Sequence, residues 1–194
     1  MSVEAPQPVA APVPDREARA ELPQVLVAAV AFALAAACFL HFGVTARGFV
    51  SAFFVIVLVV LSAIDIEQRI LPNRIVLPAT AVMLVLQIGF FPQHATEWVV
   101  SSLGAGLFFL VAFLVNRAGL GQGDVKFALL LGAGLGKGVV LGIFVGLFAA
   151  GIGGLFIIAR EGLEARKKTI PLGPFLAFGA VISLFFSGSD FVSF

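Results

Sequence analysis

The sequence predicts an all-α protein, a polytopic bundle of transmembrane helices with six to seven membrane segments. Hydrophobic residues make up 60% of the 194 residues and charged residues only 12%. The apolar fraction exceeds that of a typical soluble domain, in which about half of the residues are apolar. The mean hydropathy is correspondingly high, at +1.11. The apolar residues also form long runs, and about 20 such residues cross a bilayer as a helix. The lipid bilayer is therefore an expected partner of the whole chain.

The first residues differ in composition from the rest. Residues 1–22 are rich in proline, alanine and acidic residues, which predicts a disordered cytoplasmic tail. A signal peptide is not expected, because the charges are mixed in sign and the apolar run behind them is long enough to span. Residues 23–194 are expected to form one membrane-embedded domain.

Seven apolar runs follow one another with short turns between them, so consecutive helices are expected to be antiparallel neighbours. The fifth run has only 12 residues. It is too short for an ordinary span unless it starts deep in the membrane or lines a cavity enclosed by protein. Small residues recur every four positions at Gly138, Gly142, Gly146, Ala150 and Gly154, which favours close helix packing. The runs cover 24–44, 48–64, 74–91, 97–116, 125–136, 138–159 and 172–189.

The lysine and arginine residues predict the orientation. If the N-terminus is cytoplasmic and all seven runs cross, the inner face receives ten of these residues and the outer face only Arg47 and Lys137. Asp65 and Asp124 then both lie on the cytoplasmic side, two crossings apart. The ten inner residues are Arg16, Arg19, Arg69, Arg74, Arg117, Lys126, Arg160, Arg166, Lys167 and Lys168.

The chain lacks the residues that several classes of function require. Cys38 is the single cysteine, and His41 and His94 lie far apart, so neither an internal disulfide nor a zinc site is expected. The chain has no serine-hydrolase elbow, no zinc-protease motif, and no phosphate or dinucleotide loop. No basic patch with interleaved aromatic residues points to nucleic acid. We therefore expect no metal, no cofactor and no nucleic-acid partner.

Asp65 is the first candidate for chemistry. It follows a long apolar run, and a carboxylate at a membrane boundary is costly to desolvate. A helix C-terminus is also an unfavourable place for an anion. The plain alternative is a solvated carboxylate paired with Arg69, four residues further on. Pro72 and Asn73 are expected to restart the chain, with Asn73 as the N-cap of the next helix.

Asp124 is the second candidate, and it closes the segment Gly121-Gln-Gly-Asp124. Its plain alternative is an ordinary N-cap at the head of an apolar helix. Gly121 and Gly123 permit a close approach of another part of the chain. Lys126 either anchors the helix at the interface or reaches toward the site.

The two aspartates predict a joint chemistry if they meet. Like charges prevent both carboxyl groups from ionising together, so they share a proton. One group then activates a water molecule while the other acts as an acid toward a carbonyl group, as in aspartic proteases. Such a pair titrates as a unit, so the two roles are not assigned to individual residues.

Three stretches resemble the type IV prepilin peptidases, which belong to the Gly-x-Gly-Asp membrane aspartic proteases together with preflagellin peptidases and, more distantly, presenilin. Asp65 to Asn73 resembles the first catalytic motif, and Gly121 to Lys126 resembles the second. Ile170 to Phe175 is similar to a Pro-x-Gly-Pro stretch that opens the last helix. The resemblance extends over roughly residues 24–190 and implies that Asp65 and Asp124 are catalytic. The supporting or substrate-binding residues that it implies are Pro72, Asn73, Gly121, Gly123, Lys126, Pro171, Gly173 and Pro174.

The resemblance also implies a reaction and a location. A leader peptidase of this kind removes a short basic leader from a prepilin or pilin-like protein, after a glycine, at the cytoplasmic face of the inner membrane. Its biological setting is type IV pilus assembly or protein secretion. Many bacterial members also carry a domain with paired Cys-x-x-Cys motifs and N-methylate the product. This chain has a single cysteine, so a short, peptidase-only form is expected. The sequence leaves the particular pilin and the oligomeric state open.

Two other classes of function remain open. Carboxylates near membrane segments also mark proton-coupled carriers, although the sequence has no internal inverted repeat and no charge near the middle of a run. A non-catalytic scaffold of a pilus or secretion machine would need neither aspartate. Leader removal by Asp→Asn variants distinguishes these classes from a peptidase.

Overall fold

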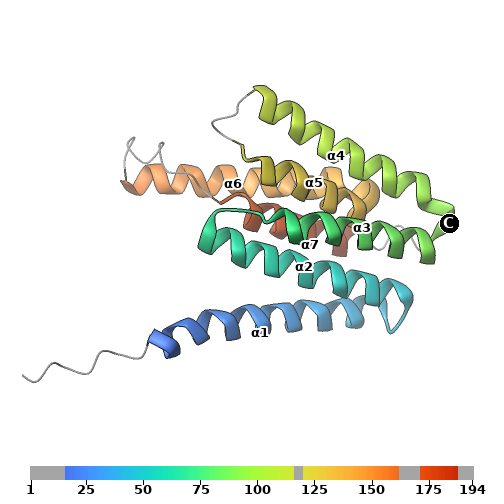
Figure 1. Cartoon of the computed structure of the whole chain (residues 1–194), viewed down its shortest axis with the longest axis horizontal. Helices are drawn as coiled ribbons and strands as arrows, with labels where there is room; N and C mark the ends of the chain where they lie inside the picture. Colours follow the sequence, from blue (N-terminus) through green and yellow to red (C-terminus); the bar gives the residue numbers. More distant parts are fainter. Residues whose placement is uncertain (1–15, 116–119, 162–170, 188–194) are drawn as a thin grey trace, which may run out of the picture.

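The computed structural model describes residues 16–115, 120–161 and 171–187. Within these ranges every regular element is a helix, so the predicted all-α class is confirmed. Two 3₁₀ turns, η1 (Pro92–His94) and η2 (Gly136–Gly138), connect longer helices (Figure 1). The α-helices are α1 (Arg16–Phe42), α2 (Ala46–Gln68), α3 (Asn73–Phe90), α4 (Ala95–Val115), α5 (Gln122–Leu135), α6 (Val139–Glu161) and α7 (Gly173–Ser187).

The predicted bundle of membrane helices agrees with the lengths of these elements. Among the described residues, five stretches are long and apolar enough to cross a membrane, and one shorter apolar helix covers Gly173–Phe186. The last of the five contains α5 and most of α6. Gly136, with a φ of 55°, ends α5, and the chain reverses its direction there. The five stretches are Gln24–Phe42, Ala46–Gln68, Asn73–Phe90, Pro92–Val115 and Gln122–Ile157.

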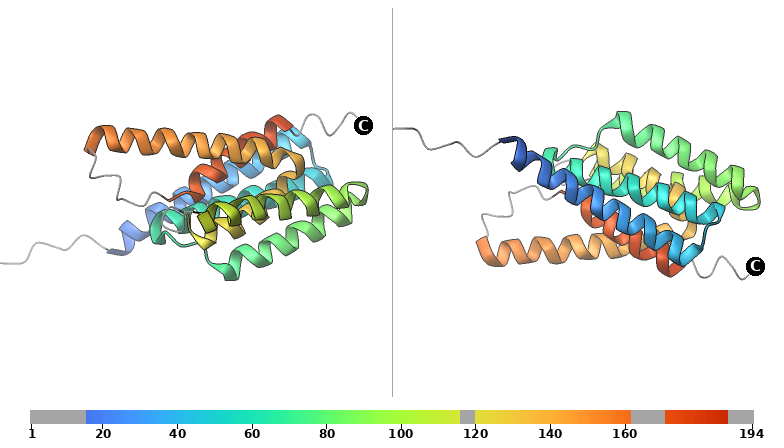
Figure 2. Two further views of the ribbon diagram at one scale, coloured as in Figure 1. Left: turned by 90° about the horizontal axis from the view of Figure 1, so that it is seen from above. Right: turned by 90° about the horizontal axis from the view of Figure 1, so that it is seen from below.

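Successive helices run in opposite directions along the bundle (Figure 1). The start of α1, the end of α2, the start of α5, the end of α6 and the start of α7 lie toward one end, which we call the site end. The connections at 43–45, 91–94 and 136–138 lie at the opposite end. Seen from above and from below, α5 and α7 begin further inside the bundle than the point where α6 ends (Figure 2).

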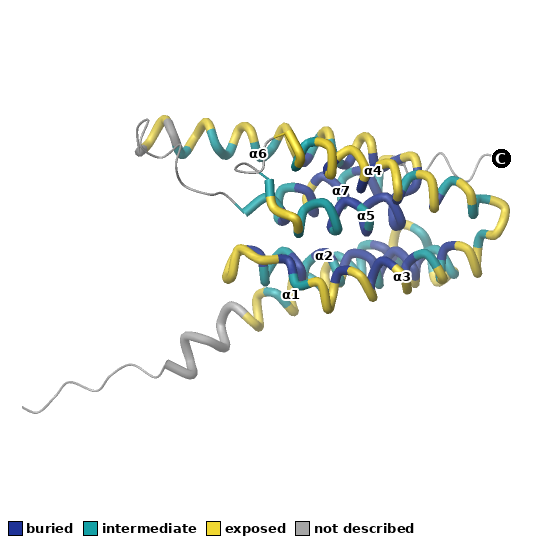
Figure 3. Tube along the Cα trace, turned by 45° about the horizontal axis from the view of Figure 1, so that its top comes forward, coloured by how far each residue is buried: buried dark blue, intermediate teal, exposed yellow. Residues whose placement is uncertain are grey.

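The short helix α5 forms the centre of one half of the bundle. It packs along α4 and α3, and most of its residues from Phe127 to Leu135 are buried (Figure 3). Its 14 residues extend over about 21 Å at about 1.5 Å per residue, less than the roughly 30 Å of a hydrocarbon core. The sequence allowed so short a segment only where it starts deep in the membrane or is enclosed by protein. The burial of α5 among its neighbours agrees with the second condition.

The other half of the bundle consists of α1, α2, α6 and α7, with α2 in contact with both α1 and α7. Two of the small residues predicted to allow close packing, Gly142 and Gly146, lie on α6 and face α7. A Cβ atom added at Gly146 would lie 2.9 Å from the Cα atom of Leu176, and Gly142 lies against Gly179. These glycines allow the two helices to approach each other closely.

The N-terminal boundary differs from the expected one. The sequence predicted a disordered tail over 1–22, but α1 begins at Arg16, and residues 1–15 lie outside the described part of the chain. Residues 16–22 consist mainly of alanine, arginine, glutamate and leucine. These are strong helix formers and continue directly into the apolar run, which explains the earlier start.

Candidate active site

Asp65 lies in the last turn of α2 and is only 6% exposed. Its backbone carbonyl accepts a hydrogen bond from the N–H of Arg69 at 2.8 Å. Arg69 adopts a left-handed conformation, with a φ of 53°, and ends the helix. The alternative ion pair between Asp65 and Arg69, both of which the structure describes, does not form. The chain therefore leaves the helix four residues after Asp65.

The carboxyl group of Asp65 contacts the start of α7. Its Oδ2 accepts a hydrogen bond from the backbone N–H of Gly173 at 2.9 Å. A Cβ atom added at Gly173 would lie 2.7 Å from the same oxygen, so a side chain at position 173 would displace the carboxyl group. The N-terminus of a helix favours an anion. It therefore opposes the unfavourable effect of the C-terminus of α2, on which Asp65 itself lies.

Asp124 lies in the first turn of α5 and is partly buried. Its Oδ2 accepts a hydrogen bond from the N–H of Gly121 at 3.0 Å, while its own N–H donates to the carbonyl of Gly121 at 3.1 Å. Gly121 is the N-cap residue, so the alternative assignment of Asp124 as the N-cap is wrong. Asp124 is the third residue of the helix and forms the carboxylate half of a capping box.

Gly123 brings the second motif against the first. A Cβ atom added at Gly123 would lie 2.9 Å from the Cβ atom of Leu71, and Leu71 is itself buried. The turn that follows Asp65 therefore rests directly on the start of α5. Nothing in the sequence marked Leu71 as a contact residue, because its partner lies 52 positions further along the chain.

A polar link joins the same two segments. Lys126 Nζ donates a hydrogen bond to Asn73 Oδ1 at 2.7 Å. The expectation that Asn73 is an N-cap is wrong, because Pro72 holds that position and no side chain caps α3. The N–H groups of Ile75 and Val76 bond to the Pro72 carbonyl. The side chain of Asn73 is thus available to bind Lys126.

The prolines of the third stretch lie at the start of α7. Pro171 comes just before the helix, and Pro174 lies in its first turn, where a missing N–H removes no helical hydrogen bond. Both positions let the chain enter the helix at Gly173, whose N–H faces Asp65. All ten residues expected at the site therefore lie on α2, α3, α5 and α7 or in the turns beside them.

Asp65 and Asp124 lie within electrostatic range of each other at the site end, and their carboxyl groups do not bond to each other. Among the described residues each carboxyl group accepts one backbone N–H through Oδ2, and Oδ1 has no protein donor. Such a pair can bind a water molecule and transfer protons to and from it. The described residues contain no group of three or more His, Cys, Asp or Glu side chains that could hold a metal ion.

Comparison with known proteins identifies the family. Residues 52–158, more than half of the chain and including both aspartates, match the type IV leader peptidase family. Three similar relatives are each named prepilin leader peptidase/N-methyltransferase. The relative from Bacillus subtilis is 28% identical over 87% of this chain, and the one from Xanthomonas campestris pv. campestris is 30% identical over 78%. The relative from Aeromonas hydrophila is 32% identical over 69%.

The matches include only part of each relative. The chain spans 66%, 54% and 48% of the length of these three proteins. No solved structure matches the chain significantly. The family match covers both acidic motifs of the site and extends from α2 to α6. This chain therefore belongs to the type IV leader peptidase family.

Proposed function

We propose that this protein is an aspartic endopeptidase that removes the basic leader from prepilins or pilin-like proteins at the cytoplasmic face of the inner membrane. Membership of the leader peptidase family supports a peptidase that processes prepilins. One observation carries the aspartic mechanism. The end of α2 and the start of α5 each place one carboxyl group at the site end, within electrostatic range of the other.

In the proposed mechanism, one carboxylate removes a proton from a water molecule as the water oxygen attacks the scissile carbonyl carbon. The protonated partner donates its proton to the carbonyl oxygen, which gives a neutral tetrahedral intermediate. When the C–N bond breaks, one carboxyl group donates a proton to the leaving amine and the other takes a proton from a hydroxyl group of the intermediate, so that a carboxylic acid is released and the pair regains its starting charge. The N–H groups of Gly173 and Gly121 hold one oxygen of each carboxyl group, and the other oxygen of each serves the reaction.

The supporting residues act in this proposal by positioning the two aspartates. Gly173, placed by Pro171 and Pro174, holds Asp65, whereas Gly121 holds Asp124. Gly123 lets α5 approach the turn that contains Pro72, and the Lys126–Asn73 hydrogen bond closes the same junction. We assign these residues positioning roles because their contacts join or hold the segments that carry the two aspartates.

Charge supports the proposed cytoplasmic location of the site. Arg69, Arg74, Lys126 and Arg160 lie on segments at the site end, while Arg47 and Lys137 lie at the opposite end. Positive residues favour the cytoplasmic side of a membrane protein. Arg117, Arg166, Lys167 and Lys168, which also contributed to the predicted orientation, lie outside the described residues. The proposal is limited to cleavage and does not include the N-methyltransferase activity named for the relatives.

The test uses co-expression with a designed probe. This membrane probe carries a short Lys/Arg leader that ends in glycine, an apolar helix of about 20 residues and a soluble reporter. We expect Asp65→Asn and Asp124→Asn each to abolish leader removal, seen as a shift in product size, while both variants still insert into membranes. Glu97→Gln, at the other end of the bundle, is the matched control and retains cleavage. Full cleavage of the probe by either aspartate variant would refute the aspartic mechanism.

A further inference from the structure

An apolar groove lies beside Asp65 on the outside of the bundle. It has a volume of about 410 Å³ and is bounded by α1, α2 and α7. Leu58 is fully buried and forms part of its floor, while Leu26 and Phe178 on its rims are 65% and 56% exposed. The other lining residues are Val27, Val30, Leu34, Val59, Ser62, Ala63, Ile66, Pro174, Ala177 and Val181.

The groove offers an occupant almost no hydrogen-bond partners. Ser62 is the only polar residue in its lining, and its hydroxyl group donates to the carbonyl of Leu58 at 2.7 Å. An extended peptide in lipid would leave its backbone N–H and C=O groups unpaired in this groove, at several kcal/mol for each group. A helix satisfies these groups internally and therefore suits the groove.

The groove leads to the candidate active site. Ile66 follows Asp65 in the chain, and Pro174 follows Gly173, so these two lining residues lie next to the bonded pair at the site end. From Ile66 the lining continues along α2 to Leu58. The eight residue-to-residue steps between these two positions correspond to about 12 Å, or roughly two turns of helix. A helix in the groove would therefore end close to the Asp65 carboxyl group.

The position of α1 opens the groove sideways to the membrane. The C-terminal half of α1 packs against the core through Leu34, Ala35 and Cys38. Between residues 24 and 30, by contrast, most side chains are exposed. Figure 1 shows the two helices diverging, with α1 moving away from α2 toward the site end. A transmembrane partner can thus reach the groove from within the bilayer.

We propose that this groove binds the apolar helix of the leader-bearing substrate and presents the cleavage site to Asp65. The inference rests on the proposed function, and it specifies where the substrate enters. Continuity with Asp65 favours the substrate over a lipid chain or a second copy of this protein. The first two turns of the apolar helix would occupy the groove, and the preceding segment would leave the helix at Ile66 and Pro174 as the extended strand that is cut.

Photocrosslinking tests the location with two closely matched phenylalanines. Phe178 in the groove is 56% exposed, and Phe108 on α4 is 55% exposed. Each is replaced by benzoylphenylalanine in the inactive Asp124→Asn protein, in membranes that contain the membrane probe. We expect a crosslink to the probe helix from position 178 and at least tenfold less from position 108. Equal crosslinking from both positions, no crosslink to the probe, or crosslinking of 178 only to a second copy would overturn the proposal.

A groove-filling substitution tests the consequence for cleavage. Val30 in the groove is 43% exposed, and Val82 on α3 is 44% exposed. We expect Val30→Trp to reduce cleavage of the membrane probe at least tenfold. A soluble peptide with the same leader and cleavage site but no apolar helix should still be cut at the original rate. Val82→Trp should leave both rates unchanged.

These outcomes separate the groove from the proposed chemistry. Both proposals are supported if Asp65→Asn cleaves neither substrate and Val30→Trp loses cleavage of the membrane probe alone. If Val30→Trp cuts both substrates at the original rates, the groove is refuted while the aspartic mechanism stands. If Asp65→Asn remains active, the mechanism fails regardless of how the groove variants behave.

Discussion

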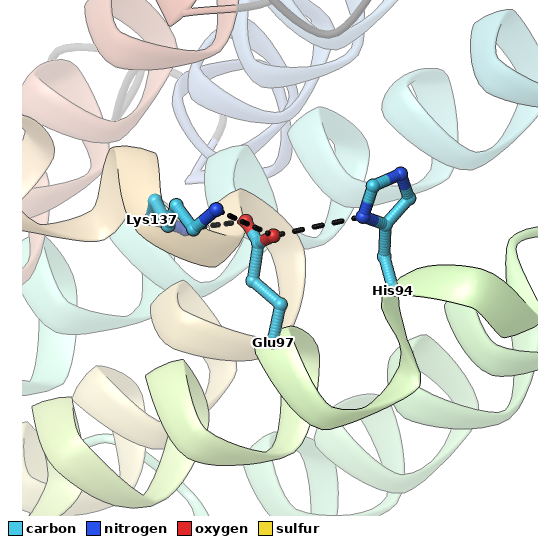
Figure 4. Close-up of polar contacts among 3 residues, drawn as sticks. All are labelled: His94, Glu97 and Lys137. Atoms are coloured by element: carbon cyan, nitrogen blue, oxygen red, sulfur yellow. Dashed lines mark hydrogen bonds and ion pairs between the residues drawn. The ribbon is translucent and has the colours of Figure 1, made fainter. Parts of the chain in front are cut away.

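Carboxyl groups lie at both ends of this bundle, but their surroundings differ. At the end opposite the site, Glu97 lies 3.3 Å from Lys137 Nζ and 3.7 Å from His94 Nδ1 (Figure 4). It also accepts the backbone N–H of Lys137 at 3.2 Å. At the site end, Asp65 and Asp124 each accept one backbone N–H, and neither forms an ion pair with any residue that the structure describes.

The difference separates a carboxylate that joins two segments from a pair that we propose exchanges protons with a water molecule. Glu97 connects the start of α4 to η2 through its ion pair with the Lys137 side chain and its hydrogen bond with the Lys137 backbone N–H. The two aspartates instead lie close enough for the charge of one to act on the other. A pair of acids that shares a proton is suited to transferring one. Four predictions test this comparison, from the largest expected effect to the smallest.

The largest effect is expected when the carboxylate charge is removed at one end or at the other. Asp65→Asn should lower the cleavage rate by at least about a thousandfold, as expected for the loss of a catalytic group. Its thermal unfolding midpoint in detergent should change little. Glu97→Gln should show the opposite pattern, with normal cleavage and a lower midpoint. The comparison would fail if Glu97→Gln lost as much activity as Asp65→Asn.

The second prediction concerns the contact between α7 and Asp65. Gly173→Ala places a Cβ atom 2.7 Å from Asp65 Oδ2, so the carboxyl group must move. A displacement of about 1 Å can cost about a hundredfold in rate, and we expect a loss of that order in single-turnover cleavage. Gly151→Ala on α6 is the matched control, because nothing lies within 4 Å of its added Cβ atom. An unchanged cleavage rate for Gly173→Ala would show that Gly173 does not position Asp65 for the reaction.

The third prediction concerns the link between the two motifs. Lys126→Met and Asn73→Ala each break the 2.7 Å hydrogen bond, and each should reduce cleavage about tenfold, equivalent to about 1.4 kcal/mol. The double variant should be no worse than either single variant, because the same contact is lost only once. Additive losses in this cycle would mean that the two residues act separately, for example by direct contact with the substrate.

The smallest effect is expected at the opposite end. Lys137→Met removes the ammonium group but keeps the backbone N–H that bonds to Glu97. The Lys137 side chain is 80% exposed, and such a pair contributes less than about 1 kcal/mol. Cleavage should be unchanged and the loss of stability should fall within that limit. A large loss of activity would show that the two ends are coupled.

Much of this protein can be predicted from linear features of the sequence. Long apolar runs dictate a helical membrane bundle, because a bilayer satisfies no backbone hydrogen bonds and the helix must do so itself. The spacing of the runs places Asp65 and Asp124 at the same end, as the structure does. Residue preferences for the N-cap position predicted the helix starts less well. The N-cap of α3 is Pro72 rather than Asn73, and the N-cap of α5 is Gly121 rather than Asp124.

Tertiary packing decided how the site is assembled. The Gly173–Asp65 and Lys126–Asn73 hydrogen bonds join residues 108 and 53 positions apart, and the groove beside Asp65 requires three helices to meet. Hydropathy and motif spacing report what each segment does in a membrane, since those properties depend on neighbours in the chain. Which helix start faces which carboxyl group depends on how side chains of distant helices fit together, and only the folded bundle determines that.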